Sequence, residues 1–424
     1  MGRDAVFAEI AERLVRRGDE RAVCSWYAAH PMSGIAVIST PSNDRIAGRR
    51  FPSLDATGNI RVSIRISRSG MELNTSLNTE PVRAAVSQVA LLSALTKRPV
   101  RLHITCTNVQ ILEELLVLLQ DASHGLLLVE VELLQTTEFS ALLGRHRRRT
   151  GRVLEALRTV EHLILEGSRD VDAKLAGIHE LERLKRLDIA GMQLCSLAPL
   201  RGMHTLSDID VSVTAITDVD IHILGQLPHL RRIIVDSCAG LKSLDPLGRH
   251  PSLRCVSAVR CVHLRLVRAL TTISTLDYVD LSYTAVRPED LARCVEGLGS
   301  VRSLALSGLR LAEVRGWAGA CWQWRRLSLM EVCAAGFGWI VAAPYLRHLV
   351  LNGTEVTEKQ LVGICASLPH LELLSVSRCL FLRTSLSFAL DMEYMHAVLI
   401  SRHSLAESNA IALLKERGVV CEVD

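Results

Sequence analysis

The chain has 424 residues, of which 49% are hydrophobic and only 4% are aromatic. Its 49 basic and 45 acidic residues leave a net charge of +4, which is too close to balance to indicate a nucleic-acid binder from charge alone. The longest uncharged apolar stretch, residues 333–346, contains two glycines and a proline and is too short to span a bilayer, so we expect no transmembrane segment.

The first 29 residues have apolar side chains at helical spacing, and His30-Pro31 ends this pattern. Acidic residues interrupt the apolar run, which argues against a secretory signal peptide and against an acid-poor mitochondrial leader: Asp4, Glu9 and Glu12. We expect residues 1–50 to form a helical N-terminal cap that shields the apolar end of the fold behind it.

Residues 6–31 also resemble an F-box, a helical module often placed ahead of leucine-rich repeats. The matching positions are Phe7, Ile10, Leu14, Asp19, Val23, Cys24 and Trp26. The resemblance implies docking on a Skp-type adaptor of a ubiquitin ligase. The customary leading Leu-Pro pair is absent, so the cap and the F-box-like segment remain alternatives.

Residues 51–159 have an irregular period but still contain strand-like stretches at 61–70, 100–109 and 126–135. A helical pattern at 109–122 follows the second of them. We interpret this region as divergent leading repeats.

A dense basic run, residues 144–152, closes this region with Arg145, Arg147, Arg148, Arg149 and Arg152. Such a run is typical of a nuclear-localisation signal or a nucleic-acid contact, and the alternative is a solvated loop. No aromatic residue interrupts the run to stack on bases, so a nucleic-acid partner is conceivable here but not favoured.

From residue 160 onward one template, L-x-x-L-x-L-x-x-(T/C) with Ile or Val allowed for Leu, recurs at intervals of 22 to 25 residues. Two further apolar columns follow the first at the fourth and sixth positions of each repeat. The eleven repeats begin at Val160, Leu184, Leu206, Leu230, Leu253, Leu276, Val301, Trp324, Leu346, Leu371 and Met395.

This pattern resembles the leucine-rich repeat family. The resemblance implies an α/β solenoid, a horseshoe with a parallel β-sheet on its concave face and a convex side of mixed helix, 3-10 helix and loop. Residues 160–424 would then hold the regular repeats and a C-terminal cap. Helical spacing at 289–301 and 359–371 predicts convex helices, whereas 199–206 is too short for one.

Prolines recur just before the next strand, at 228, 251, 344 and 369, where they end the convex segments. His229, His250 and His370 adjoin these prolines, and we expect them at the surface. No histidine or cysteine spacing predicts a metal site.

Short polar side chains occupy the ninth repeat position, where we expect an inward ladder bonded to neighbouring backbone: Thr214, Cys238, Cys261, Thr284, Thr354 and Cys379. Free buried thiols of this kind favour a reducing compartment. We therefore expect an intracellular protein, cytoplasmic or nuclear, with a mitochondrial location as a further option.

Strand alternation predicts that the third, fifth and seventh repeat positions face the concave side, which is acidic in its first half. The candidate protein-binding residues are Glu166, Asp188, Asp208, Asp210, Asp236, Tyr278, Asp280, Arg326 and His348. A basic lane at the second position lies beside them: Lys185, Arg231, Arg254, Arg302, Arg325 and Arg347. Polar residues kept only for solubility are the alternative.

Three tryptophans cluster at 317–324, where core filling is a simpler explanation than an aromatic anchor for a partner. No phosphate-binding loop, paired carboxylates or nucleophile elbow is present, so we expect no catalytic residues and no cofactor. The sequence predicts a non-enzymatic scaffold that binds a protein partner. The alternatives are a substrate receptor of a ubiquitin ligase and a component of a ribonucleoprotein or cytoskeletal complex.

Overall fold

The computed structural model describes strands at 53–54, 60–65, 100–106 and 126–134, and then residues 160–166, 175, 177–194, 196–311, 317, 321–334, 336–405 and 409–423. The chain divides into two compact units, Met1–Leu194 and Cys195–Asp424. The expected N-terminal helices, the F-box-like segment and the basic run at 144–152 lie outside the described residues.

The first unit contains a sheet whose strands follow the order of the chain. Strand β1 pairs antiparallel with β2, and each later strand pairs parallel with the one before it. The three strands expected from residues 61–70, 100–109 and 126–135 are confirmed as β2, β3 and β4. The strands are β1 Ser53–Leu54, β2 Ile60–Arg65, β3 Val100–Cys106, β4 Leu126–Leu134, β5 His162–Glu166 and β6 Arg186–Asp188.

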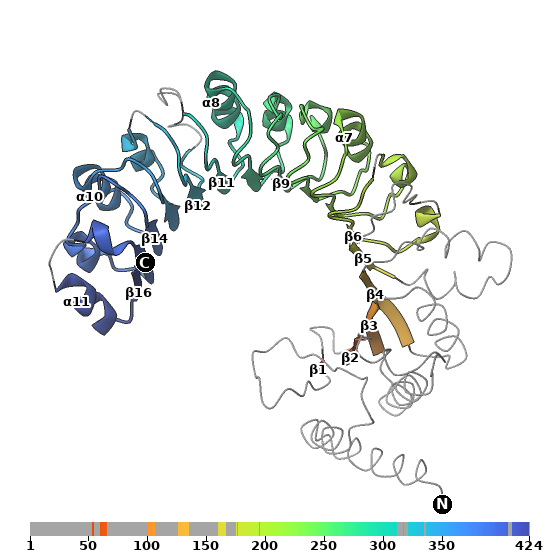
Figure 1. Ribbon diagram of the computed structural model, residues 1–424, viewed down its shortest axis with the longest axis horizontal. Coiled ribbons are helices and arrows are strands. Elements are labelled where there is room, and N and C mark those ends of the chain that lie inside the picture. Colours follow the sequence, from red (N-terminus) through yellow and green to blue (C-terminus); the bar gives the residue numbers. More distant parts are fainter. Residues whose placement is uncertain are drawn as a thin grey trace, which may run out of the picture. The chain divides into compact units, whose positions relative to one another are not determined.

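The described part of the second unit contains a parallel sheet of short strands, again in chain order. Figure 1 shows these strands along the inner side of an arc, with the helices on its outer side. The strands are β7 Asp208–Asp210, β8 Arg232–Ile234, β9 Cys255–Ser257, β10 Tyr278–Asp280, β11 Ser303–Ala305, β12 Arg326–Ser328, β13 His348–Val350, β14 Leu373–Val376, β15 Ala397–Ile400 and β16 Val420–Val423.

The core consists of the repeated apolar columns. In the repeat of β13, Leu346, Leu349 and Leu351 are fully buried, and the equivalent residues of the other repeats are 5% exposed or less. Because successive strands pair in register, the residues of each column stack on one another from repeat to repeat. The columns therefore exclude water along the sheet. The chain therefore folds as a leucine-rich repeat solenoid.

The outer side of the second unit mixes α-helices with shorter 3-10 turns, as expected. The two predicted convex helices are confirmed as α8 and α10, whereas α7 was not predicted. The segments are η3 Ala198–Leu200, α7 Asp218–Leu224, η4 Asp245–Leu247, η5 Arg268–Thr272, α8 Pro288–Gly297, η6 Gly338–Ala342, α10 Glu358–Ala366, η7 Ser387–Asp391, η8 Arg402–Ser404 and α11 Ala410–Glu416.

In nine repeats the backbone turns to a left-handed conformation at the eighth position, which ends the alternation of the strand. Glycine supplies this conformation in some repeats, but several repeats use other residues, including Tyr283 with φ of 59°. The column comprises Gly191, Val213, Ser237, Arg260, Tyr283, Gly308, Glu331, Gly353 and Arg378.

The predicted ladder at the ninth position is confirmed. Thr214 Oγ1 donates to Val211 O at 2.6 Å, and Cys238 Sγ donates to the same carbonyl from the next repeat at 3.3 Å. Cys261 Sγ likewise reaches back to Val235 O at 3.0 Å. Burial raises the pKa of the Cys261 thiol to about 12, so it stays protonated and able to donate.

The expectation that the proline-associated histidines lie at the surface holds for His229 and His370 but is wrong for His250, which is only 4% exposed. His250 lies three residues before the first apolar position, where Leu227 and Ile273 occupy the same column. Its Nε2 pairs with Leu227 O at 2.9 Å and its Nδ1 accepts from Ser252 N at 3.3 Å. These two bonds satisfy a neutral imidazole inside the core.

Trp317 and Trp324 fill the core as expected, with exposures of 1% and 0%. Both make edge contacts with Trp339, at ring-centroid distances of 4.8 and 6.1 Å. Trp322, in contrast, is 51% exposed. No helix in the described part of the chain combines the length and hydropathy required to cross a bilayer.

Candidate protein-binding face

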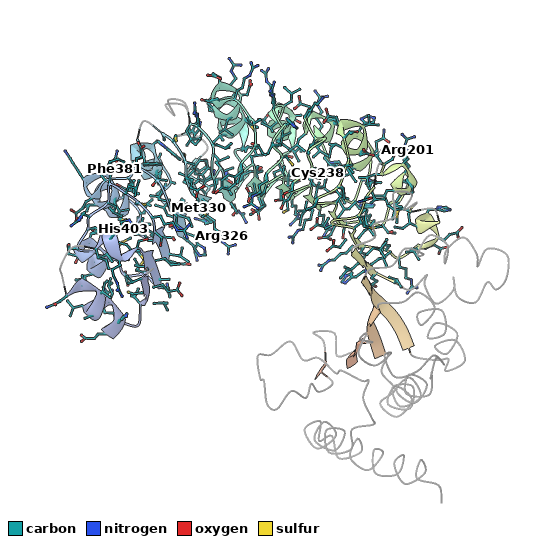
Figure 2. The ribbon with its side chains drawn as sticks, viewed as in Figure 1. Arg201, Cys238, Arg326, Met330, Phe381 and His403 are labelled. Atoms are coloured by element: carbon teal, nitrogen blue, oxygen red, sulfur yellow. The ribbon has the colours of Figure 1, made fainter. Side chains whose placement is uncertain are left out.

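Two rows of side chains cross the inner face of the second unit. The third repeat position forms the row Asp208, Arg232, Cys255, Tyr278, Ser303, Arg326, His348, Leu373 and Ala397, in which each residue is the register partner of the next. The fifth position forms the row Asp210, Ile234, Ser257, Asp280, Ala305, Ser328, Val350, Ser375 and Leu399. Figure 2 shows Arg326 on the inner side of the arc and Arg201 on the outer side.

The acidic residues of these rows gather at one end, over β7 to β10. We define the acidic patch as Asp208, Asp210 and Asp280 of these rows together with Asp236, which follows β8 at the seventh position; each is partly exposed. From β11 to β15 neither row contains a carboxylate. Charge is therefore segregated along the sheet rather than distributed evenly for solubility.

Asp210 and Asp280 are held in the same way. Oδ1 of Asp210 accepts from Ser212 N at 2.9 Å, and Oδ1 of Asp280 accepts from Ser282 N at 3.0 Å. Bonds from a carboxylate to a backbone N–H two residues ahead fix the side chain at the strand end. Tyr278 Oη adds a bond to Oδ2 of Asp280 at 3.1 Å. Both carboxylates are preorganised on the surface.

Asp236 differs from these two because its carboxylate joins neighbouring repeats. Its Oδ1 accepts from Ser257 Oγ at 2.7 Å and from Val259 N at 2.8 Å. Asn352 makes the same pair of bonds to Ser375 Oγ and Ser377 N.

The expectation that the seventh position faces the concave side is wrong for five of the ten repeats in which the structure describes this residue. Strand alternation stops at the left-handed eighth residue. The side chains just before it turn inward and accept hydrogen bonds from backbone N–H groups of the next repeat. Serines at this position are 8% exposed or less: Ser212, Ser282, Ser307, Ser377 and Ser401.

The electrostatics of the patch reflect its crowding. Burial raises the pKa of Asp236, and the nearby Asp280 and Asp210 charges raise it further, against the two hydrogen bonds that lower it. Burial and the Asp280 carboxylate likewise raise the pKa of the Tyr278 phenol, so it remains a donor at neutral pH. The cluster thus concentrates negative charge that a cationic partner would neutralise.

The remaining predicted site residues lie elsewhere. Glu166 and Asp188 belong to β5 and β6 of the first unit, where Oδ1 of Asp188 accepts from Ala190 N at 3.1 Å. Arg326 and His348 are register partners on β12 and β13, separated from Tyr278 by β11. The structure gathers only part of the predicted set into one cluster.

The predicted basic lane lies along the leading edge of the sheet, where the strands begin. Three of its members form ion pairs: Lys185 with Glu161 at 3.2 Å, Arg302 with Asp277 at 3.7 Å and Arg347 with Glu372 at 2.8 Å. Because Asp277 and Glu372 occupy the same repeat position as the basic residues, the lane is less uniformly basic than expected.

Sequence reasoning missed a second group at this edge. Tyr345, His370 and Tyr394 each directly precede the first apolar residue of their repeats, and their rings follow one another along the edge. The signal was visible in the aromatic residue ahead of Leu346, Leu371 and Met395. Within the described ranges no group of three or more His, Cys, Asp and Glu residues could hold a metal ion.

Three solved structures resemble the chain, each with a TM-score below 0.5. An internalin from Listeria monocytogenes matches at 14% identity and a TM-score of 0.42, over 68% of this chain and 94% of its own. Internalin C2 from Listeria monocytogenes matches at 15% and 0.35, over 41% and 74%. TLR13, in a complex with ssRNA13, matches at 11% and 0.47, over 85% and 61%. No family model and no curated protein matches the chain.

Proposed function

We propose that the chain is a non-enzymatic scaffold of an intracellular assembly and that its acidic patch binds a basic segment of a protein partner. The observation that carries this proposal is the gathering of Asp208, Asp210, Asp236 and Asp280 over four adjacent strands. Like charges at this spacing repel one another and weaken the fold, so a role in binding explains why they are kept together.

The partner chemistry follows from the side chains. Carboxylates fixed by hydrogen bonds form charge-assisted bonds with lysine or arginine, and they lose little entropy because they are already oriented. Tyr278 offers a ring next to them for the apolar part of such a segment. The buried thiols that donate to backbone carbonyls support a reducing compartment, as in the cytoplasm or nucleus.

The proposal is tested by purifying the tagged chain from its native cell and identifying bound proteins by mass spectrometry. The Asp210→Lys/Asp280→Lys variant is expected to lose the partners of the wild type. The control, Glu296→Lys/Glu416→Lys, makes the same charge change at exposed positions on α8 and α11 and is expected to keep them. Retention of every partner by the patch variant would refute this site.

A second function, a ubiquitin-ligase substrate receptor, rests on the F-box-like residues 6–31. A version lacking residues 1–50 distinguishes the scaffold function from the receptor function in the same experiment. Recovery of a Skp-type adaptor and a cullin with the full chain alone supports the receptor. Recovery of one stable assembly with both versions supports an N-terminal cap and a scaffold.

A third function, in a ribonucleoprotein or cytoskeletal complex, rests on the arginines of 144–152. Neutralising this run should weaken such an assembly and reduce its salt dependence.

A further inference from the structure

The leading edge of the second unit carries a row of three exposed rings from consecutive repeats, which we term the aromatic strip: Tyr345, His370 and Tyr394. The Tyr345 and His370 rings are nearly parallel, with an interplanar angle of 9° and centroids 6.3 Å apart. The His370 and Tyr394 centroids are 5.6 Å apart at an angle of 54°. Each tyrosine is 44% exposed, so the strip is an open aromatic surface and not part of the core.

Basic groups lie directly against the strip. The Arg325 guanidinium lies 4.9 Å from the centre of the Tyr345 ring and donates to Tyr345 O at 3.2 Å. Stacking leaves most of its N–H donors pointing outward in a fixed plane. Arg326 follows it on β12 and is exposed, and Arg347 lies in the next repeat.

The negative charge near the strip is small and largely compensated. Glu372 is bonded to Arg347 at 2.8 Å and lies 3.6 Å from His348 Nε2. The acidic patch ends at β10, and the inner rows of β11 to β15 contain no carboxylate. Glu393 precedes Tyr394, so positive charge is concentrated toward the Arg325 end.

We propose that this edge binds a single-stranded nucleic acid, with bases stacked on the aromatic strip and phosphates held by Arg325 and Arg326. Exposed rings beside arginines are what an unpaired strand requires, since every base has a face to stack and every linkage has a charge. A duplex has no free base faces to offer. An acidic peptide would use the arginines but leave the rings without a role.

This surface is separate from the acidic patch, and the inference does not depend on the proposed protein-binding function. It also differs from the basic run at 144–152, which has no aromatic neighbours in sequence. The register of the repeats brings together Tyr345, His370 and Tyr394, although about 25 residues separate each from the next.

The test measures fluorescence anisotropy of labelled oligonucleotides of about ten residues, oligouridine and oligothymidine, titrated with the full chain at two salt concentrations. We expect binding that weakens as salt rises. Tyr345→Ala/Tyr394→Ala should raise Kd about tenfold or more, whereas Tyr345→Phe/Tyr394→Phe, which keeps both rings, should stay near wild type.

Two matched controls lie away from the strip. Phe381→Ala removes an exposed aromatic ring that follows β14, and Arg260→Gln removes an arginine that also lies over a tyrosine ring, that of Tyr283. Both should leave Kd unchanged, whereas Arg325→Gln should raise Kd and reduce the salt slope by about one. Urea unfolding verifies that each variant is folded. If the alanine pair does not fold, His370→Ala carries the same expectation.

Three results would overturn the proposal: no binding at low salt, the same Kd in strip and control variants, or displacement of the oligonucleotide by polyglutamate at equal charge with no effect of the ring substitutions. The last result would assign the edge to an acidic protein segment.

Discussion

His250 is a titratable side chain in an otherwise apolar column, and this placement predicts a pH response. Burial lowers the pKa of its imidazole. The unfolded chain therefore takes up a proton first, at a pKa of about 6.5, and stability is lost as pH falls from there toward the lower folded pKa. The loss ends once pH is below both values.

The variant His250→Gln separates this effect from other titrations. Glutamine can donate to Leu227 O and accept from Ser252 N, yet it carries no charge. We expect the free energy of unfolding in urea to fall more for the wild type than for the variant between pH 7 and pH 5. Parallel pH profiles would show that the histidine is not the source.

The raised pKa of Asp236 predicts that stability changes with pH in the opposite direction. Its raised pKa means that the protonated carboxyl favours the folded state, so its stabilising contribution is present below about pH 3.9 and is lost as pH rises through the folded pKa. Asp236→Asn keeps an acceptor for Ser257 Oγ and Val259 N without the charge. We expect it to raise the free energy of unfolding at pH 7 and to weaken partner binding. Lower stability with unchanged binding would assign the carboxylate to repeat stacking.

At the scale of the turn, Gly308 permits a surface contact that spans two repeats. The Tyr283 ring lies so close to Gly308 that an added Cβ would be 2.3 Å from Cδ1 of the ring. The ring lies beneath Arg260 at 5.9 Å, and Tyr283 Oη donates to Oε2 of Glu331 at 3.0 Å. Gly308 also has φ of 70°.

Gly308→Ala should therefore lower the free energy of unfolding by about 1 kcal/mol from backbone strain and by a further amount from displacing the ring. Gly202→Ala is the matched control, because its φ is 80° but no atom lies within 4 Å of an added Cβ. In a Tyr283→Ala background the two glycine substitutions should have similar effects. A difference that persists there would contradict the contact.

At the scale of the convex segment, Asp220 joins α7 to the preceding repeat. Its Oδ2 accepts from Thr217 N at 2.9 Å and its Oδ1 accepts from Leu197 N at 2.7 Å, and the residue is 2% exposed. Asp220→Ala leaves two backbone donors unpaired and should cost about 3 kcal/mol in urea unfolding. Asp245→Ala is a milder comparison, because Asp245 is exposed and accepts from one backbone donor, Ala269 N. Equal losses would show that burial does not set the cost.

Some elements of the fold could be predicted from the sequence and others could not. The apolar columns, the ninth-position ladder and the helices α8 and α10 follow from patterns that repeat, so one sequence suffices for them. α7 was not predicted although Thr217 and Asp220 form a capping box, which is a sequence signal for a helix start. The inward turn of the seventh position was missed because the left-handed residue after it is usually not glycine and gives no signal.

The candidate sites show the same division. The acidic patch could be predicted from repeat phase, since phase places Asp208, Asp210 and Asp280 in the two inner rows over β7 to β10. The column of rings in the aromatic strip is visible in the sequence, but the orientation of the rings is not, because it depends on contacts between turns such as that of Arg325 with Tyr345. The position of a residue in the repeat predicts which column it occupies, whereas contacts with neighbouring repeats determine how its side chain is oriented.

At the scale of the whole molecule, the second unit stacks repeats through apolar columns, buried thiols and backbone ladders, so each repeat depends mainly on its neighbours. The two proposed binding surfaces divide the same sheet: carboxylates over β7 to β10, and rings with arginines along the leading edge from β12 to β15. One rigid element can therefore present two different chemistries without either disturbing the core.

The central claim is that repeat phase decides which side chains are buried and which are displayed. The most direct test compares Leu349→Asp with Asp210→Lys by circular dichroism during urea unfolding. Leu349 is fully buried, so a charge there should unfold or aggregate the protein, whereas Asp210→Lys should unfold close to wild type and alter only binding. Equal loss of folded protein in both variants would contradict the claim.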